Sequence, residues 1–289
     1  MRRPVVKAVE ADGPYCSAVR MVQPCLLSFI GLLVFGQILA GKVLAANGLV
    51  PGPFVSAATG ERLLLVDKSR HRLYVFDDSF NPIRSFRVTT GKRAGDKLER
   101  GDLKTPEGVY FFTGVIDGRE LPPKYGVMAL VTDYPNPIDR LAGKTGSGIW
   151  LHATDDPSRI QRPRDTRGCV VATDEDVLEI AGYVDLGRTP LVVVKELDYH
   201  SREDAEALKK AVVGFMERAG LLGDRKGGGG VTVLRHKEAF VVSAAGRITY
   251  LLRDADGFRV AGKRRYEPGD DLKGMIERLA ERLTKGPRR

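Results

Sequence analysis

The chain carries a cysteine and a histidine whose types and spacing could support nucleophilic catalysis. Cys169 lies in the segment TRGCVV at 166–171, seventeen positions after His152, which ends the apolar run IWLH at 149–152. A thiol is nucleophilic as the thiolate, and its ordinary pKa is about 8.5. An imidazole at the end of a neighbouring strand can accept the thiol proton and hold the thiolate as an ion pair. The pattern predicts Cys169 as nucleophile and His152 as proton acceptor and donor.

Three neighbouring residues are candidates for oxyanion or substrate binding. Gly168 permits a tight bend before Cys169, so that backbone N–H groups can point at the oxyanion of an acyl-transfer intermediate. Arg167 could orient a substrate carboxylate, although a solvated loop arginine is the alternative. Ala153 could contribute through its backbone. A cysteine in a valine-rich run is also commonly a small buried apolar residue, so the residues alone leave an acyltransferase, a hydrolase and a structural cysteine open.

The N-terminus has the pattern of a targeting segment. Residues 25–40 are uncharged and apolar, four basic residues precede them, and Val43-Leu44-Ala45 fits a small-x-small cleavage site. We expect residues 1–46 to be a signal peptide or an N-terminal hydrophobic helix that contacts the inner membrane. A buried core helix is the alternative, but a helix that is apolar all round needs a large surrounding core. Outside the cytoplasm, an unpaired Cys169 needs a functional reason.

Composition limits the classes of partner. The hydrophobic fraction of 43% excludes a disordered chain, and the net charge of +9 favours anionic surfaces. No basic stripe interleaved with aromatic residues indicates a nucleic-acid partner. His200 and His236 are isolated, so we expect no metal and no cofactor.

Residues 47–60 are rich in glycine and proline and are predicted to form a linker. Residues 61–197 are predicted to form a mainly β sandwich or barrel with one or two short helices. A helix should begin after Thr173, a suitable N-cap, and end by Gly187. The predicted strands are 63–66, 73–76, 83–89, 109–112, 127–131, 149–152 and 191–194.

Residues 198–289 are predicted to form a small α+β appendage. Helical spacing marks 204–219 and 271–283, with strands at 231–234, 239–242, 248–252 and 258–261 between them. The basic cluster at 263–265 and the basic tail at 288–289 suggest docking to the cell wall or to a partner.

The segment 149–171 resembles the signature of the L,D-transpeptidase catalytic domain of the YkuD type, a histidine on a strand followed by Ser/Thr-x-Gly-Cys. The upstream segment GDLKTPEGVY at 101–110 resembles that family's Thr-Pro-x-Gly segment. The resemblance covers about residues 61–195. The chain departs from the family pattern at Arg167, Ala153 and Val171, where His, Gly or Ser, and Arg or Asn are usual.

The resemblance implies a β fold of the L,D-transpeptidase type and a peptidoglycan substrate. Cys169 would attack the carbonyl between the diamino acid and the terminal D-Ala of a tetrapeptide stem. An amine of another stem, or of an envelope protein, would then accept the acyl group. Three alternatives stay open: an L,D-carboxypeptidase or endopeptidase with water as acceptor, a cysteine peptidase of another cell-wall family, and a non-catalytic wall-binding module. We expect an exported protein of a bacterial cell envelope.

Overall fold

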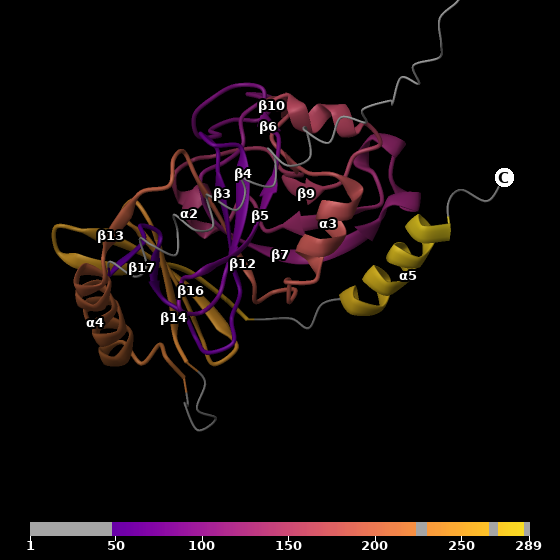
Figure 1. Ribbon diagram of the computed structural model, residues 1–289. Coiled ribbons are helices and arrows are strands. Elements are labelled where there is room, and N and C mark those ends of the chain that lie inside the picture. The colour runs from indigo at the N-terminus through magenta and orange to yellow at the C-terminus, as the bar shows by residue number, and fades with distance from the viewer. Residues whose placement is uncertain (1–47, 224–229, 266–270, 286–289) are drawn as a thin grey trace, which may run out of the picture.

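The computed structural model describes residues 48–223, 230–265 and 271–285, and within them the protein is mainly β (Figure 1). The predicted N-terminal hydrophobic helix lies outside these ranges. Within the described part of the chain, none of the helices combines the length and the apolar character needed to span a membrane.

The central element is a mixed sheet of eight strands. The pairs β12–β3 and β11–β9 are parallel and the other neighbours are antiparallel. In spatial order the strands are β11 (Val170–Val171), β9 (Trp150–His152), β8 (Met128–Thr132), β7 (Gly108–Asp117), β12 (Pro190–Val194), β3 (Leu63–Asp67), β4 (Arg72–Phe76) and β5 (Pro82–Arg87).

Short elements surround the end of this sheet that carries β9 and β11. A two-stranded parallel pair joins the chain after β5 to the segment that precedes Cys169. These elements are β6 (Thr90–Gly91), β10 (Arg164–Thr166), η1 (Gly118–Glu120), η2 (Pro123–Tyr125), η3 (Pro157–Gln161) and α3 (Asp174–Ala181). A further short helix, α2 (Pro137–Leu141), lies instead against the C-terminal strands 247–254 and 257–265.

The central sheet is buried on both faces, which explains why its strands are almost continuously apolar. In β3, Leu64 and Val66 join the cluster that includes α3, whereas Leu63 and Leu65 join the cluster that includes the C-terminal sheet. Successive side chains of a strand point to opposite faces. An apolar run such as LLLV therefore fills two cores at once.

A second sheet of five strands covers one of these faces, at the left of Figure 1. Helix α4 packs against this sheet, and its residues Val212 and Met216 are buried there. A short antiparallel pair joins β1 to β13. The elements are β17 (Gly257–Arg265), β16 (Arg247–Asp254), β15 (Ala239–Ala244), β14 (Thr232–His236), β2 (Phe54–Ser56), β1 (Leu49–Pro51), β13 (Tyr199–Ser201) and α4 (Arg202–Arg218).

The segment 47–60, expected to be a linker, contains two strands. Strand β1 pairs with β13, and β2 forms the edge of the five-stranded sheet beside β14. Gly and Pro occur beside short edge strands as well as in linkers, so composition alone did not distinguish an edge strand from a linker. Residues before and after the catalytic region thus share one sheet.

The last helix, α5 (Leu272–Lys285), returns to the other face and lies beside α3 (Figure 1). Its buried residues Leu272 and Leu279 belong to the same apolar cluster as α3 and the central sheet. The C-terminal segment therefore covers the central sheet on both sides, through its own sheet on one face and through α5 on the other.

Helix α3 follows the sequence expectation closely at its start. The Thr173 hydroxyl accepts a hydrogen bond from the N–H of Asp176, and Val177, Ile180 and Ala181 are buried. The acidic first turn complements the positive helix N-terminus. The helix ends at Ala181, earlier than the expected limit at Gly187, because the chain turns there with two hydrogen bonds back to the last helical carbonyls.

A buried carboxylate joins the central sheet to the C-terminal sheet. Asp133 accepts hydrogen bonds from Tyr250 (2.8 Å) and from the N–H of Phe111 (2.9 Å). Arg264 lies 3.8 Å from this carboxylate, and its guanidinium lies 4.9 Å from the centre of the Phe111 ring. Burial raises the pKa of Asp133, and Arg264 opposes that shift. The middle residue of the predicted basic docking cluster is thus an internal ion-pair partner.

We expect Arg264→Ala to destabilise the fold by about 2 kcal/mol, because it leaves a buried charge with one partner fewer. The matched control is Arg265→Ala, since Arg265 is exposed on the same strand. Urea denaturation of both variants measures the difference. Equal midpoints for the two variants would show that the Asp133 contact does not stabilise the association of the two sheets.

Candidate active site

His152 is the last residue of β9 and lies inside the sheet, between β8 and β11. Its side chain is buried, with 4% exposure. Nδ1 lies 2.6 Å from the carbonyl oxygen of Ala153. Because a carbonyl only accepts, we assign the proton to Nδ1, which leaves the Nε2 lone pair free to take a proton. Ala153, predicted to act through its backbone, is buried and supplies this orienting carbonyl.

The imidazole is neutral at neutral pH. Burial lowers the pKa of His152 to about 4, against the opposing effect of the Ala153 carbonyl. The positive charges of Arg159 and Lys124 add to the decrease. A neutral imidazole is the protonation state that a general base needs.

Cys169 directly precedes β11, and its position is set by a strained turn. Gly168 has φ of 137°, a conformation that residues with a side chain rarely adopt. A Cβ at this position would lie 2.8 Å from Cδ1 of Ile149 and 2.9 Å from the carbonyl oxygen of Lys104. Glycine is therefore required here both by the backbone angle and by the close approach of two neighbours.

The Thr166 side chain holds the same turn from inside. Its hydroxyl accepts from the N–H of Gly168 (3.0 Å) and donates to the carbonyl of Cys169 (2.7 Å). The N–H of Gly168 is thus already engaged, and Cys169 itself carries the nearest backbone N–H for an oxyanion. The sequence motif contained Thr166, but its hydroxyl role depends on the turn geometry.

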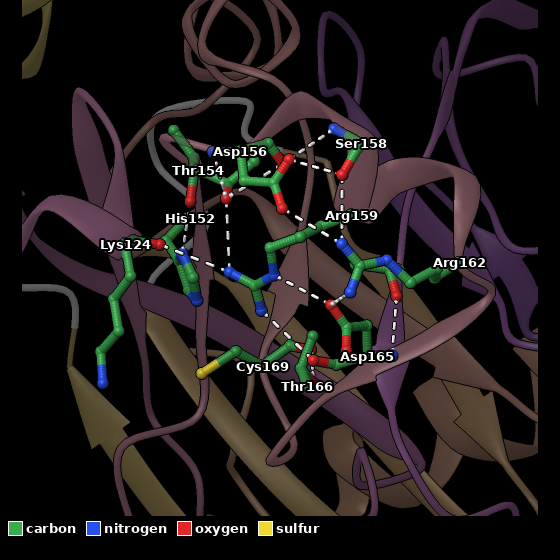
Figure 2. Close-up of polar contacts among 12 residues, drawn as sticks. Lys124, His152, Thr154, Asp156, Ser158, Arg159, Arg162, Asp165, Thr166 and Cys169 are labelled. Carbon is green, nitrogen blue, oxygen red and sulfur yellow. Dashed lines mark hydrogen bonds and ion pairs between the residues drawn. The ribbon is translucent and has the colours of Figure 1, made fainter.

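The thiol and the imidazole share one face of the sheet. Val171 pairs with His152 and Val170 with Leu151 in the parallel ladder. Residues two apart on a strand point to the same side, so Cys169 points to the side of Val171 and His152. Figure 2 shows the sulfur and the imidazole beside the same guanidinium, that of Arg159.

The cysteine rests as a neutral thiol. Sγ donates to the carbonyl oxygen of Gly148 at 3.4 Å, and no hydrogen bond joins it to the imidazole among the described residues. Burial raises the pKa of the Cys169 thiol, although the N–H of Trp150 and the charge of Arg159 oppose this rise. The ion pair expected from the sequence is therefore not the state that burial favours before substrate binds.

An aromatic wall completes the pocket around the imidazole. The Tyr125 ring centre lies 4.7 Å from that of His152 and 5.4 Å from that of Trp150. Lys124 lies over the outer side of the Tyr125 ring. Sequence reasoning missed Tyr125, Lys124 and Arg159, because they lie in the short helices η2 and η3, which carry no local motif.

The segment TPEG at 105–108 packs against the chain that carries the cysteine motif. The Thr105 hydroxyl accepts from the N–H of Gly91 (2.9 Å), and Glu107 pairs with Lys68 (3.0 Å) inside the protein. The carbonyl of Lys104, one residue before this segment, lies against Gly168. The contact of Lys104 with Gly168 thus brings this upstream segment against the cysteine motif.

Arg167 stays a candidate for substrate binding only. It is exposed and lies between the buried Thr166 and Gly168. Within the described ranges, no group of three or more His, Cys, Asp or Glu side chains is arranged to hold a metal ion. Cys169 is the free cysteine of those ranges.

Comparisons with known proteins agree with the fold. Residues 61–194 match the family model of the YkuD L,D-transpeptidase catalytic domain. Among solved structures, Bd1075 of Bdellovibrio bacteriovorus is similar with a TM-score of 0.59 and 22% identity, over 76% of this chain and 99% of that one. The helical cell shape determining protein Pgp2 of Campylobacter jejuni is similar with a TM-score of 0.50 and 18% identity, over 74% and 96%.

A search of curated protein sequences finds no match. The two structures, below 25% identity, agree with the fold, whereas the family model covers the segment that holds both His152 and Cys169. The match thus identifies residues 61–194 of this chain as similar to the L,D-transpeptidase catalytic domain family.

Proposed function

We propose that the protein is a cysteine-dependent acyltransferase of the bacterial cell envelope that acts on peptidoglycan stem peptides. The observation that carries this proposal is that a partly exposed thiol and an imidazole, whose Nε2 lone pair the Nδ1 tautomer leaves free, lie on one face of a sheet. The substrate class comes from the family, whose members act on peptidoglycan stems.

The proposed first step transfers one proton and forms one bond. The thiol leaves the Gly148 carbonyl and gives its proton to Nε2 of His152, while Sγ attacks the carbonyl carbon between the diamino acid and D-Ala. The N–H of Cys169 donates a hydrogen bond to the oxyanion and stabilises its charge. When the C–N bond breaks, the imidazolium gives its proton to the leaving amine of D-Ala, and a thioester remains.

Burial of His152 suits the second half of this step. A buried imidazolium is unfavourable, so the proton is returned readily to the leaving amine. The same neutral imidazole can then deprotonate the acceptor that attacks the thioester. One residue thus serves as base and acid in turn.

We propose an amine of a second stem as the acceptor, and a cavity of about 760 Å³ between the chain around η2 and helix α5, lined by neither His152 nor Cys169, as a candidate place for that stem. Its lining includes Pro123 and Gly126, which flank Tyr125, and Asp155 and Asp174, whose carboxylates suit an ammonium group. Helix α5 forms its other wall through Arg278 and Arg282. Water would instead make the enzyme a carboxypeptidase or endopeptidase, and an amine of an envelope protein would make it a protein-attachment enzyme.

We further propose export to the periplasm, with residues 1–46 as signal or anchor, because the substrate lies outside the cytoplasm. A role in determining cell shape, which the name of the Campylobacter protein states for that protein, is consistent with the proposed action on the cell wall. A non-catalytic wall-binding module is the contrasting function, and a thiol that never reacts would support it.

We expect Cys169→Ala to lose D-Ala release from tetrapeptide muropeptides by about 10³-fold or more, because the nucleophile is absent. Unchanged thermal melting serves as the folding control. Incubation of the wild type with a carbapenem should give one covalent adduct by intact-mass analysis, absent in the variant. Release of D-Ala by Cys169→Ala at the wild-type rate would exclude the mechanism.

The pH dependence follows from the lowered pKa of His152, about 4. The base acts only when neutral, so activity should persist below pH 6 and be lost as the pH falls through about 4. The ratio kcat/KM for D-Ala release measures this profile, with circular dichroism to verify folding at each pH. An acid limb centred at the ordinary imidazole value of about 6.5 would contradict a buried base.

Product analysis identifies the acceptor. Purified residues 47–289 incubated with tetrapeptide muropeptides should yield 3–3 cross-linked dimers together with free D-Ala, because the proposed acceptor is an amine of a second stem. Mass spectrometry separates these dimers from tripeptides. Tripeptides alone, at every muropeptide concentration, would assign the hydrolytic reaction instead.

A further inference from the structure

Arg159 lies in the short helix η3 and turns its side chain inward toward the site (Figure 2). Its guanidinium makes four hydrogen bonds. Nε donates to the Asp165 carboxylate (3.1 Å), Nη2 donates to the Asp165 carbonyl (3.2 Å), and Nη1 donates to the Thr154 hydroxyl (3.3 Å) and the Lys124 carbonyl (3.5 Å). The side chain is 19% exposed. An arginine held this fully has a fixed position.

The three partners belong to three separate segments, and each segment carries one part of the site. Thr154 follows His152 by two residues. Lys124 precedes Tyr125, whose ring packs on the imidazole. Asp165 precedes Thr166, whose hydroxyl holds the turn at Cys169. The Arg159 guanidinium therefore hydrogen-bonds to the segment that follows His152, to the segment that carries Tyr125 and to the turn that precedes Cys169.

The charge of Arg159 also acts on both reacting groups. It favours the neutral imidazole of His152 and the thiolate of Cys169. Lys124 is the other cation that acts on both, and the Asp165 carboxylate partly compensates Arg159. Removal of the Arg159 charge should thus raise the pKa of both groups.

We infer that Arg159 is a positioning residue, which sets the distance and orientation between the Cys169 thiol and the His152 imidazole by fixing three segments, and which supports the thiolate with its charge. It acts through these segments and through its electrostatic effect on the sulfur. The inference depends on the proposed function only in taking Cys169 as the reactive group.

The chain offers a matched control in Arg162, on the segment that directly follows η3. Arg162 also pairs with Asp165 (3.3 Å) and with Asp156 (3.1 Å), but its side chain is 55% exposed. It has no contact with Thr154 or Lys124 among the described residues. If the loss of one positive charge near the site were the cause, both arginine variants would be affected alike. If positioning is the cause, only the Arg159 variants should be affected.

The test measures alkylation of Cys169 by iodoacetamide across pH, without substrate, in wild type, Arg159→Gln, Arg159→Lys and Arg162→Gln. Cys16 and Cys25 are excluded by the use of residues 47–289. We expect Arg159→Gln to move the alkylation midpoint upward by roughly half a pH unit or more. Arg159→Lys should keep the midpoint, because it keeps the charge, and Arg162→Gln should match the wild type.

Turnover gives the second readout. We expect kcat for D-Ala release to fall about 10-fold or more in Arg159→Gln and also in Arg159→Lys, since one ammonium cannot reach all three partners. The midpoint and kcat of Arg162→Gln should stay at wild-type values.

Three outcomes would overturn the inference. The first is a wild-type midpoint and kcat in Arg159→Gln, and the second is an equal shift in Arg162→Gln. The third is a rise in KM alone with unchanged alkylation, which would indicate recognition of a substrate carboxylate. If Arg159→Gln melts at lower temperature, Arg159→Lys with a normal melt and a reduced kcat keeps the test valid. A shifted midpoint in a protein that releases no D-Ala would uphold this inference while rejecting the proposed function.

Discussion

The site depends on the parallel pairing of β9 with β11. This short ladder places Val171 opposite His152, and so directs the cysteine and the histidine to one face although seventeen residues separate them. The ladder extends at both margins, where Val171 exchanges hydrogen bonds with Thr89 and where the N–H of Ala153 donates to Met128. Backbone hydrogen bonds therefore position the reacting groups, and the side chains around them refine that position.

Burial then sets the protonation states. The imidazole is buried and the thiol is partly buried, and burial favours the neutral form of each. A neutral thiol is a weaker nucleophile than a thiolate, so the pair becomes reactive when the thiol proton moves to the imidazole. Arg159 and Lys124 moderate this effect at the sulfur, and the aromatic wall of Tyr125 and Trp150 maintains it at the imidazole.

The C-terminal segment belongs to the structural frame of this site. Its sheet closes one face of the central sheet through the apolar cluster around Tyr250 and Ile248, and α5 closes the other beside α3. The ion pair between Asp133 and Arg264 adds a polar contact between the central sheet and the C-terminal sheet. The number of basic side chains that the cluster at 263–265 presents to solvent is thus smaller than expected, because Arg264 pairs with Asp133 between the two sheets.

The sequence by itself determined the elements that local patterns encode and the residues that can do chemistry. Apolar runs located the main strands, the Thr173 cap with its acidic turn located α3, and the cysteine motif located Cys169 and His152. Tertiary structure decided what depends on distant partners. The strand pairing of residues 49–56, the inward turn of Arg264 and the convergence of Lys124, Thr154 and Asp165 on Arg159 all join segments far apart in the chain. A local pattern records the preference of a residue for a strand, a helix or a turn, whereas such contacts depend on which surfaces meet after the chain has folded.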